Sequence, residues 1–155
     1  ANPGDEVLLP DPGFPTYYSV LNYTGITAVP VPLQQEDNFQ MRADEISRKI
    51  TLRSKLLIIN SPQNPTGSII SEDEVMKIFG LAERHDLFLL SDEVYTDSVY
   101  EGAPFSPATQ DFCKERTILL KSLSKNYSMT GWRIFWPGWI FGHGPDCVLS
   151  GPGQM

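Results

Sequence analysis

A lysine, two serines and an arginine follow the apolar run Thr117–Leu120, in the order Ser122, Ser124, Lys125 and Arg133. The apolar run is typical of a buried strand. In an open α/β sheet, ligands bind beyond the carboxyl ends of the strands. A lysine held there out of bulk water has a lowered pKa, and its neutral amine is a nucleophile toward carbonyl groups. The alternative for Lys125 is an ordinary surface lysine after a strand.

Two further apolar runs also end in polar residues. Lys55–Asn60 leads into a turn that contains Asn64, and Leu87–Leu90 leads into Asp92. A carboxylate at the end of an apolar strand is costly unless it has a partner, although Asp92 is alternatively an exposed loop acid. Because neighbouring parallel strands end at one edge of a sheet, we expect these polar residues to meet the lysine there.

Alternating strands and helices connect these runs, which predicts an α/β fold: a three-layer, mainly parallel sheet flanked by helices. The strongest helix begins at Ser71, because Glu74 three residues later completes a capping-box pattern and an apolar stripe follows. Prolines in the extended segment 27–33 favour an edge strand. Strands are expected at 6–10, 27–33, 55–60, 87–90 and 117–120, and further helices at 17–23 and 43–50.

Composition excludes several classes of protein. The chain has 155 residues and a net charge of −7, which gives nucleic-acid binding no electrostatic support. Apolar runs are too short to span a membrane, so no membrane role is expected. Cys113 and Cys147 lack metal-ligand spacing, so we predict no metal site and a reducing, cytoplasmic setting. His85 and His143 are isolated and are interpreted as structural or surface residues.

One aromatic residue, Phe14, lies in the rigid turn Pro12–Pro15. The prolines fix φ, and Gly13 permits unusual dihedral angles. Phe14 is either a core plug beneath the loop or a residue that stacks on a ligand. An amine, an acid for a ring nitrogen, donors for a phenolic oxygen and a hydroxyl–arginine pair for a phosphate are what pyridoxal phosphate requires.

The chain from Asn2 to about Gly142 resembles the large domain of class I/II aminotransferases, which have the aspartate-aminotransferase-like fold. The order and spacing of the motifs make the resemblance specific. The matching segments are Asn2-Pro3-Gly4-Asp5, Pro12-Gly13-Phe14-Pro15, Asn64-Pro65-Thr66-Gly67, Ser91-Asp92-Glu93-Val94-Tyr95, Ser122-Leu123-Ser124-Lys125 and Gly131-Trp132-Arg133.

The resemblance implies catalytic roles for Lys125, Asp92 and Tyr95. Lys125 would form the Schiff base with pyridoxal 5′-phosphate and afterwards move the proton between substrate and cofactor. Asp92 would pair with the pyridinium nitrogen. Tyr95 and Asn64 would hydrogen-bond the phenolic oxygen of the ring.

The resemblance also implies the remaining cofactor contacts. Phe14 would stack on the ring face, and Ser122 and Arg133 would bind the phosphate. Ser124 is a further phosphate candidate. Tyr17 lies close to Phe14 in the sequence, and no role is assigned to it.

The resemblance further implies that the domain is partial. Residues 1–142 would form part of the cofactor-binding large domain, and residues 143–155 form an unplaced tail. An upstream phosphate-binding loop and a downstream small domain, both usual in the family, are expected to be absent from this chain. Phe135-Trp136-Pro137 interrupts the usual pattern of the family, so we expect an inserted bulge in that strand or an aberrant translation of it.

The predicted function is a pyridoxal-phosphate-dependent aminotransferase of amino-acid metabolism, including biosynthesis. It would move an amino group between an amino acid and a 2-oxo acid through a Lys125 Schiff base. A cytoplasmic homodimer is expected for the full-length protein, and the fragment alone is expected to be inactive. The alternatives are a carbon–sulfur lyase or synthase on the same fold, a non-catalytic aminotransferase-like effector domain of a transcription regulator, or a non-functional truncated product.

Overall fold

A six-stranded sheet forms the centre of the molecule, in the order β2-β1-β3-β4-β5-β6. The computed structural model describes residues 1–111, 115–132 and 134–139. Strands β1 to β5 run parallel to their neighbours, and β6 pairs antiparallel with β5. The strands are β1 (Glu6–Asp11), β2 (Thr27–Pro32), β3 (Ser54–Asn60), β4 (Phe88–Asp92), β5 (Thr117–Ser122) and β6 (Phe135–Trp139). The mainly parallel α/β sheet predicted from the sequence is therefore confirmed.

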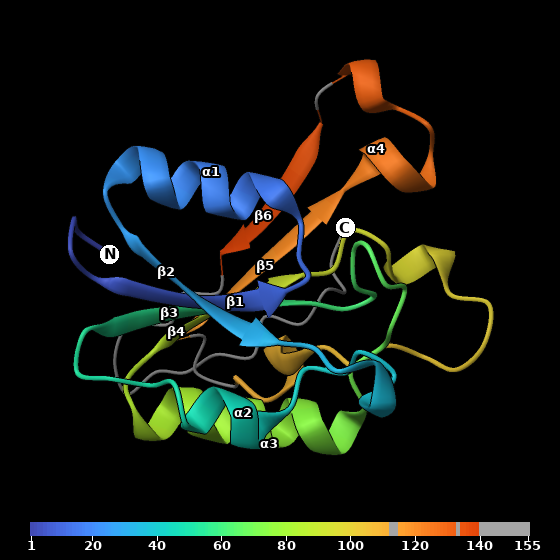
Figure 1. The fold of residues 1–155 in the computed structure, drawn as a ribbon. Helices are drawn as coiled ribbons and strands as arrows, with labels where there is room; N and C mark the ends of the chain where they lie inside the picture. Colours follow the sequence, from blue (N-terminus) through green and yellow to red (C-terminus); the bar gives the residue numbers. More distant parts are fainter. Residues whose placement is uncertain (112–114, 133, 140–155) are drawn as a thin grey trace.

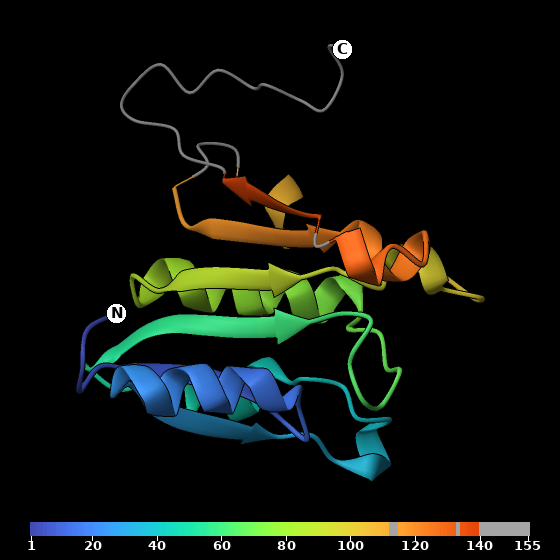
Figure 2. The ribbon, with the colours of Figure 1, turned by 90° about the horizontal axis from the view of Figure 1, so that it is seen from above.

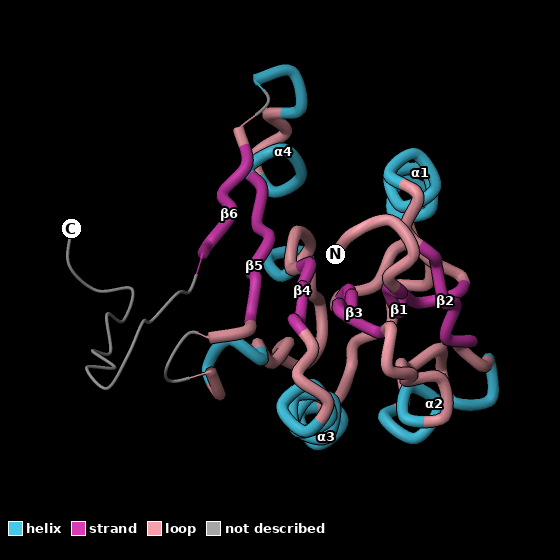
Figure 3. Tube along the Cα trace, turned by 90° about the vertical axis from the view of Figure 1, so that its left-hand side faces the viewer, coloured by secondary structure: helices cyan, strands magenta, loops and turns pink. Residues whose placement is uncertain are grey.

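Helices cover both faces of the sheet. Within the described residues, the α-helices are α1 (Pro15–Thr24), α2 (Ala43–Ser47), α3 (Glu72–Arg84) and α4 (Leu123–Asn126). Helix α1 lies on one face over β1 and β2, whereas α2 and α3 lie on the opposite face (Figures 1 and 3). Seen from above, the strands follow one another across the sheet, and α4 lies beyond the end of β5 (Figure 2). None of the helices in the described ranges has the length and apolar character needed to span a bilayer.

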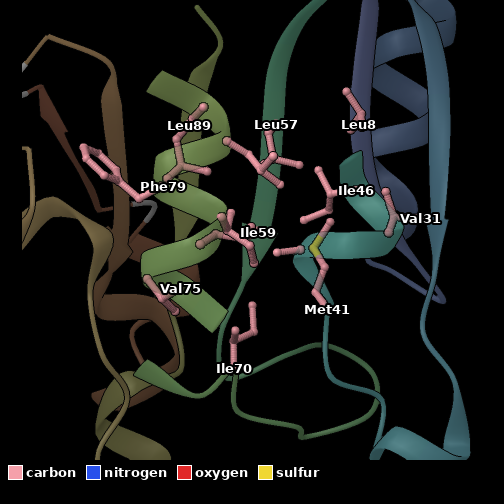
Figure 4. Packing of buried hydrophobic residues seen from close by; sticks show 14 of the residues in the cluster. Leu8, Val31, Met41, Ile46, Leu57, Ile59, Ile70, Val75, Phe79 and Leu89 are labelled. Atoms are coloured by element: carbon pink, nitrogen blue, oxygen red, sulfur yellow. The ribbon is translucent and has the colours of Figure 1, made fainter. Parts of the chain in front are cut away.

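The larger part of the core lies between the sheet and the helices α2 and α3 (Figure 4). Helix α3 buries Val75, Ile78 and Phe79, the stripe that its sequence predicts. These side chains pack with residues of the strands, such as Leu57 and Leu89. A smaller cluster, Val7, Leu9, Leu21 and Ile58, lies under α1 on the other face. Burial on both faces explains why the central strands are continuous apolar runs.

Capping at Ser71 follows the prediction in part. The Ser71 hydroxyl accepts a hydrogen bond from the Glu74 backbone N–H at 3.4 Å. The Glu74 side chain does not complete the reciprocal bond. It accepts instead from the Ala43 backbone N–H at 2.9 Å and from Lys77 Nζ at 2.7 Å. Glu74 thus links α3 to α2, in place of the reciprocal capping bond that the sequence pattern predicts.

Two expectations of local structure need correction. The helix expected over residues 43–50 ends at Ser47, and Ile50 packs against the core from the turn that follows. The bulge expected around Phe135-Trp136-Pro137 is not present in the described strand, because β6 pairs with β5 from Phe135 to Trp139 without a register shift. Antiparallel pairing at the sheet edge tolerates a proline whose missing N–H faces away from the neighbouring strand.

Candidate active site

The ends of β3, β4 and β5 surround a cavity of about 320 Å³. Because these strands are neighbours in the sheet and run parallel, their carboxyl ends meet at one edge. Of the residues that the structure describes, those lining the cavity are Phe14, Asn60, Asn64, Asp92, Val94, Tyr95, Leu120, Ser122, Ser124, Lys125 and Thr130. Its volume lies at the lower end of the roughly 300–1,000 Å³ typical of small-molecule sites.

The predicted site residues are brought together here. Phe14, Asn64, Asp92, Tyr95, Ser122, Ser124 and Lys125 all line this one cavity. Arg133 lies outside the described residues, as do Cys113, Cys147 and His143. His85, in the described part, is an exposed residue at the end of α3, away from the cavity lining.

Asp92 is the last residue of β4, and it is buried. Its Oδ1 accepts the Val94 backbone N–H at 3.2 Å, and its Oδ2 accepts the hydroxyl of Tyr17. Burial raises the pKa of the Asp92 carboxyl, while the hydrogen bonds from Tyr17 and Val94 oppose that shift by favouring the charged form. Asp92 is therefore a partly compensated buried acid, and the alternative of an exposed loop acid is excluded.

Glu93 follows Asp92 directly and is also buried, yet its surroundings differ. It accepts hydrogen bonds from the hydroxyls of Ser91 and Ser106, and its Oε2 lies 3.7 Å from Lys121 Nζ. Because successive side chains point to opposite sides of an extended segment, the two carboxylates lie on different faces of it. Only Asp92 lines the cavity.

Asn64 and Tyr95 form a second polar group in the cavity wall. Asn64 Nδ2 donates to the Tyr95 hydroxyl at 3.4 Å, a long hydrogen bond. The Asn64 backbone is itself held, because its N–H donates to Asn60 Oδ1 at 2.8 Å. Both side chains also line an adjoining cavity of about 610 Å³, so this pair separates two hollows of the surface.

Lys125 lies in the short helix α4, which follows β5 without a break. It lines the cavity but is exposed. The expectation that this lysine is held out of bulk water is therefore not met by the described residues. The reason is its position, because α4 extends past the end of the sheet, where few described elements cover it (Figures 1 and 2).

Ser122 and Ser124 begin the same turn. Ser122 Oγ accepts the Ser124 backbone N–H at 3.1 Å and donates to the Ile134 carbonyl at 3.4 Å. Thr130 Oγ1 donates to the Ser124 carbonyl at 3.3 Å. Hydroxyl and backbone groups of this turn thus hold it in shape beside Lys125.

Phe14 is the residue before α1, and it lines the cavity rather than the core. Phe14 is 39% exposed, which excludes the alternative that it fills the core beneath the loop. Gly13 sets its position, because a Cβ at residue 13 would lie 2.3 Å from the Pro10 carbonyl oxygen. The chain can make this close turn only with glycine.

Three polar residues in or directly behind the cavity wall, Asn60, Tyr17 and Thr130, had no role predicted from the sequence. Asn60 ends an apolar strand as Asp92 does, and that pattern was a usable signal. Tyr17 lies three residues after Phe14, a spacing that places both side chains on one side of a helical turn. Thr130 carried no signal, since it lies in a short 3₁₀ turn that only the folded chain brings back to the cavity.

A parallel α/β sheet with an amine, a carboxylate, an amide and hydroxyls at its strand ends defines a ligand-binding domain of the open-sheet class. Residues 1–146 match the family model described as aminotransferase class I and II, and the chain belongs to that family.

Known relatives agree with this assignment. An arginine–pyruvate transaminase of Pseudomonas aeruginosa is 39% identical over 147 residues, which cover 95% of this chain and 37% of the relative. A probable aspartate/prephenate aminotransferase of Aquifex aeolicus is 44% identical over 133 residues, covering 84% of this chain and 34% of the relative. The chain thus spans about a third of the length of these relatives.

Solved structures show the same fold. Aspartate aminotransferase from Thermus thermophilus, solved with maleate, has a TM-score of 0.85 and 36% identity, covering 88% of this chain and 35% of that chain. Alanine aminotransferase from Pyrococcus furiosus has a TM-score of 0.86 and 32% identity, covering 91% and 36%. The predicted fold family is confirmed by both kinds of comparison.

Proposed function

We propose that the full-length protein containing this chain is a pyridoxal-phosphate-dependent aminotransferase that acts on an amino acid and a 2-oxo acid. The observation that carries the proposal is the convergence of Lys125, Asp92 and Asn64, from the ends of three neighbouring strands, on one cavity. Family membership and the names of the relatives, which include transaminases for arginine with pyruvate and for aspartate, support the same class of substrates.

The donor set fits the cofactor. When bound, pyridoxal phosphate supplies a carbonyl that reacts with amines and a cationic ring that withdraws electrons from the substrate α-carbon. Lys125 would hold that carbonyl carbon covalently through its amine. As a free amine, Lys125 would also be the group that carries a proton to and from the substrate α-carbon. Its exposure in this chain leaves room for a substrate to approach.

Asp92, Asn64 and Tyr95 would orient the ring. The Asp92 carboxylate would accept the proton-bearing ring nitrogen, and it is the buried anion in the cavity wall. The Asn64 amide and the Tyr95 hydroxyl, 3.4 Å apart, would both be available to donate to the phenolic oxygen of the ring. Phe14, at the cavity edge, would cover one face of the ring.

Ser122, Ser124 and Arg133 are the proposed phosphate ligands. Ser122 would exchange its 3.4 Å bond to the Ile134 carbonyl for a shorter bond to a phosphate oxygen. Arg133 would add a planar pair of donors, as the resemblance implies. These contacts position the cofactor; they take no part in the proton transfer.

Several wider assignments rest on family resemblance and belong to this proposal. Residues 1–142 would be part of the large domain, and residues 143–155 stay unassigned. The full-length enzyme would be a cytoplasmic homodimer of amino-acid metabolism. Residues 1–155 alone would be inactive, because they span only about a third of the length of the aminotransferases they match.

The proposal is tested on the full-length protein with added pyridoxal phosphate. Borohydride reduction and peptide mapping should place a pyridoxyl group on Lys125. Lys125→Ala should abolish the label, while Lys55→Ala, which removes an exposed lysine of β3, should leave it unchanged. A label on another lysine, or none, would reject the assignment.

Product analysis separates the remaining enzyme and binding alternatives. An aminotransferase converts an amino acid and a 2-oxo acid into the exchanged pair, with no loss of sulfur from cysteine-type substrates. Release of a thiol or sulfide would indicate a carbon–sulfur lyase, and cofactor binding with no turnover would indicate an effector domain. For residues 1–155 alone, an unchanged melting temperature with pyridoxal phosphate would indicate that the fragment does not bind it.

A further inference from the structure

Tyr17 links two parts of the candidate site that are far apart in the sequence. It lies in the first turn of α1, and its hydroxyl donates a hydrogen bond to Asp92 Oδ2, 75 residues further along the chain. The bond joins the helix on one face of the sheet to the end of β4. Tyr17 does not line the cavity, so it acts behind Asp92.

The ring of Tyr17 also contacts Phe14. Their ring centroids are 5.6 Å apart with an interplanar angle of 85°, an edge-to-face arrangement. The Tyr17 backbone N–H donates to the Phe14 carbonyl at 3.1 Å. One side chain therefore contacts both the aromatic and the acid that the proposed function places against the cofactor ring.

The hydrogen bond leaves Asp92 able to bind a ligand. Oδ1 accepts the Val94 N–H and Oδ2 accepts the Tyr17 hydroxyl, but each carboxylate oxygen has two lone-pair sites. A third donor, such as a ring N–H, can still be accepted. With two fixed donors, the carboxylate cannot rotate freely about its χ2 angle.

The hydroxyl is also suited to remain the donor. Burial, followed by the charge of Asp92, raises the pKa of Tyr17, so it stays protonated through the neutral range. A hydrogen bond to the charged form of a carboxyl favours that form. Tyr17 thus counteracts the effect of burial on Asp92.

Resting on the proposed function, we propose that Tyr17 is a positioning residue for cofactor binding. It holds the Asp92 carboxylate ionised and aimed at the ring nitrogen, and it supports the Phe14 ring that covers the cofactor face. The contribution of its hydroxyl depends on the ring nitrogen of the cofactor, because the hydroxyl acts on the cofactor through Asp92.

The test compares Tyr17→Phe with the full-length native protein, using two cofactors. Dissociation constants are measured for pyridoxal phosphate and for its 1-deaza analogue, in which carbon replaces the ring nitrogen. A hydrogen bond to a charged group contributes about 1.5–3 kcal/mol, so Tyr17→Phe should raise the dissociation constant of pyridoxal phosphate roughly tenfold or more. It should change the dissociation constant of the 1-deaza analogue less than about twofold, because that analogue has no ring nitrogen to pair with the Asp92 carboxylate.

Tyr18→Phe is the matched control. Tyr18 is the next residue of α1, and its hydroxyl bonds to Asp11 rather than Asp92. This variant should bind both cofactors as the native protein does. Tyr17→Leu removes the ring contact with Phe14 as well, so it should raise the dissociation constants of both cofactors. Unfolding midpoints of all variants check that the fold is retained.

Two results would overturn the inference while leaving the proposed function intact: unchanged pyridoxal phosphate binding by Tyr17→Phe, or an equal loss for both cofactors, which would mean a merely structural role. If the native protein binds no pyridoxal phosphate, the proposed function itself fails, and the inference fails with it.

Discussion

Asn60 and Asp92 are register partners at the ends of β3 and β4, and the Asn60 side chain donates through Nδ2 to the Asp92 carbonyl oxygen at 2.9 Å. The same amide bonds the Pro62 carbonyl at 3.1 Å and accepts the Asn64 backbone N–H at 2.8 Å. One buried side chain therefore fixes the backbone of two proposed cofactor contacts, Asn64 and Asp92.

Asn60→Ala should destabilise the protein and loosen the site. Asn60 is 1% exposed, and its replacement would remove the partner of the Pro62 carbonyl and of the Asn64 N–H, whereas the Asp92 carbonyl would keep the Ser61 N–H at 3.2 Å. Leaving such groups unpaired costs about 2–3 kcal/mol, measured as the free energy of unfolding in urea. Asn22→Ala, at an exposed position of α1, should change it by less than about 0.5 kcal/mol. Equal effects at both positions would contradict the role given to Asn60.

Gly13→Ala and Gly80→Ala should act in opposite directions. The new Cβ at residue 13 would lie 2.3 Å from a backbone oxygen, whereas nothing lies within 4 Å of one at residue 80. Gly13→Ala should cost about 1–3 kcal/mol and weaken pyridoxal phosphate binding, since Phe14 must shift. Gly80→Ala, inside α3, should stabilise the protein by roughly 0.5–1 kcal/mol. Thermal unfolding with and without cofactor measures the stability and the cofactor binding of each variant. A stabilising effect of Gly13→Ala would show that the turn can accommodate a Cβ.

Asp92→Asn should stabilise the cofactor-free protein at pH 7 and impair its function. The folded pKa of this carboxyl is raised by burial above the unfolded value of about 3.9. The buried charge therefore lowers stability at neutral pH, and this penalty disappears as the pH falls below the unfolded pKa. The variant should unfold at higher urea than the native protein at pH 7 and at the same urea near pH 3. Turnover should fall on the order of 10²–10³-fold.

Asp37→Asn is the control for that substitution, because Asp37 is exposed. It should leave the free energy of unfolding at pH 7 and the turnover of the native protein unchanged. A loss of stability at pH 7 in Asp92→Asn would show that its hydrogen bonds outweigh its burial.

Asp111→Asn should have the opposite dependence on pH. Burial raises the pKa of Asp111, but the backbone N–H groups of Glu115, Arg116 and Thr117, at 3.0, 3.0 and 2.7 Å, outweigh it and hold that pKa below its usual range. Its stabilisation is present above the unfolded pKa of about 3.9 and is lost as the pH falls through the folded pKa.

The variant should therefore be less stable than the native protein by about 1–3 kcal/mol at pH 7. The gap should narrow at pH 2, because both forms then lack the charge. Urea unfolding at the two pH values measures the gap, and a constant gap would mean that the charge of Asp111 contributes nothing.

The sequence by itself determined the parallel sheet and the identity of most candidate site residues. Continuous apolar runs such as Lys55–Asn60 specify strands buried on both faces, and polar residues directly after them must lie at the strand ends. The capped, striped helix α3 was equally readable, because caps and 3.6-residue periodicity are local properties.

Only the tertiary structure decided how these groups are held and exposed. The hydrogen bonds from Tyr17 to Asp92 and from Ala43 to Glu74 join residues that no local pattern connects. The tertiary structure also decided that Asp92 lines the cavity, whereas its neighbour Glu93 does not. The exposure of Lys125 is likewise a product of where α4 ends up relative to the sheet. Local sequence sets which dihedral angles and faces a segment favours, but hydrogen-bond partners and burial depend on which segments packing brings together in space.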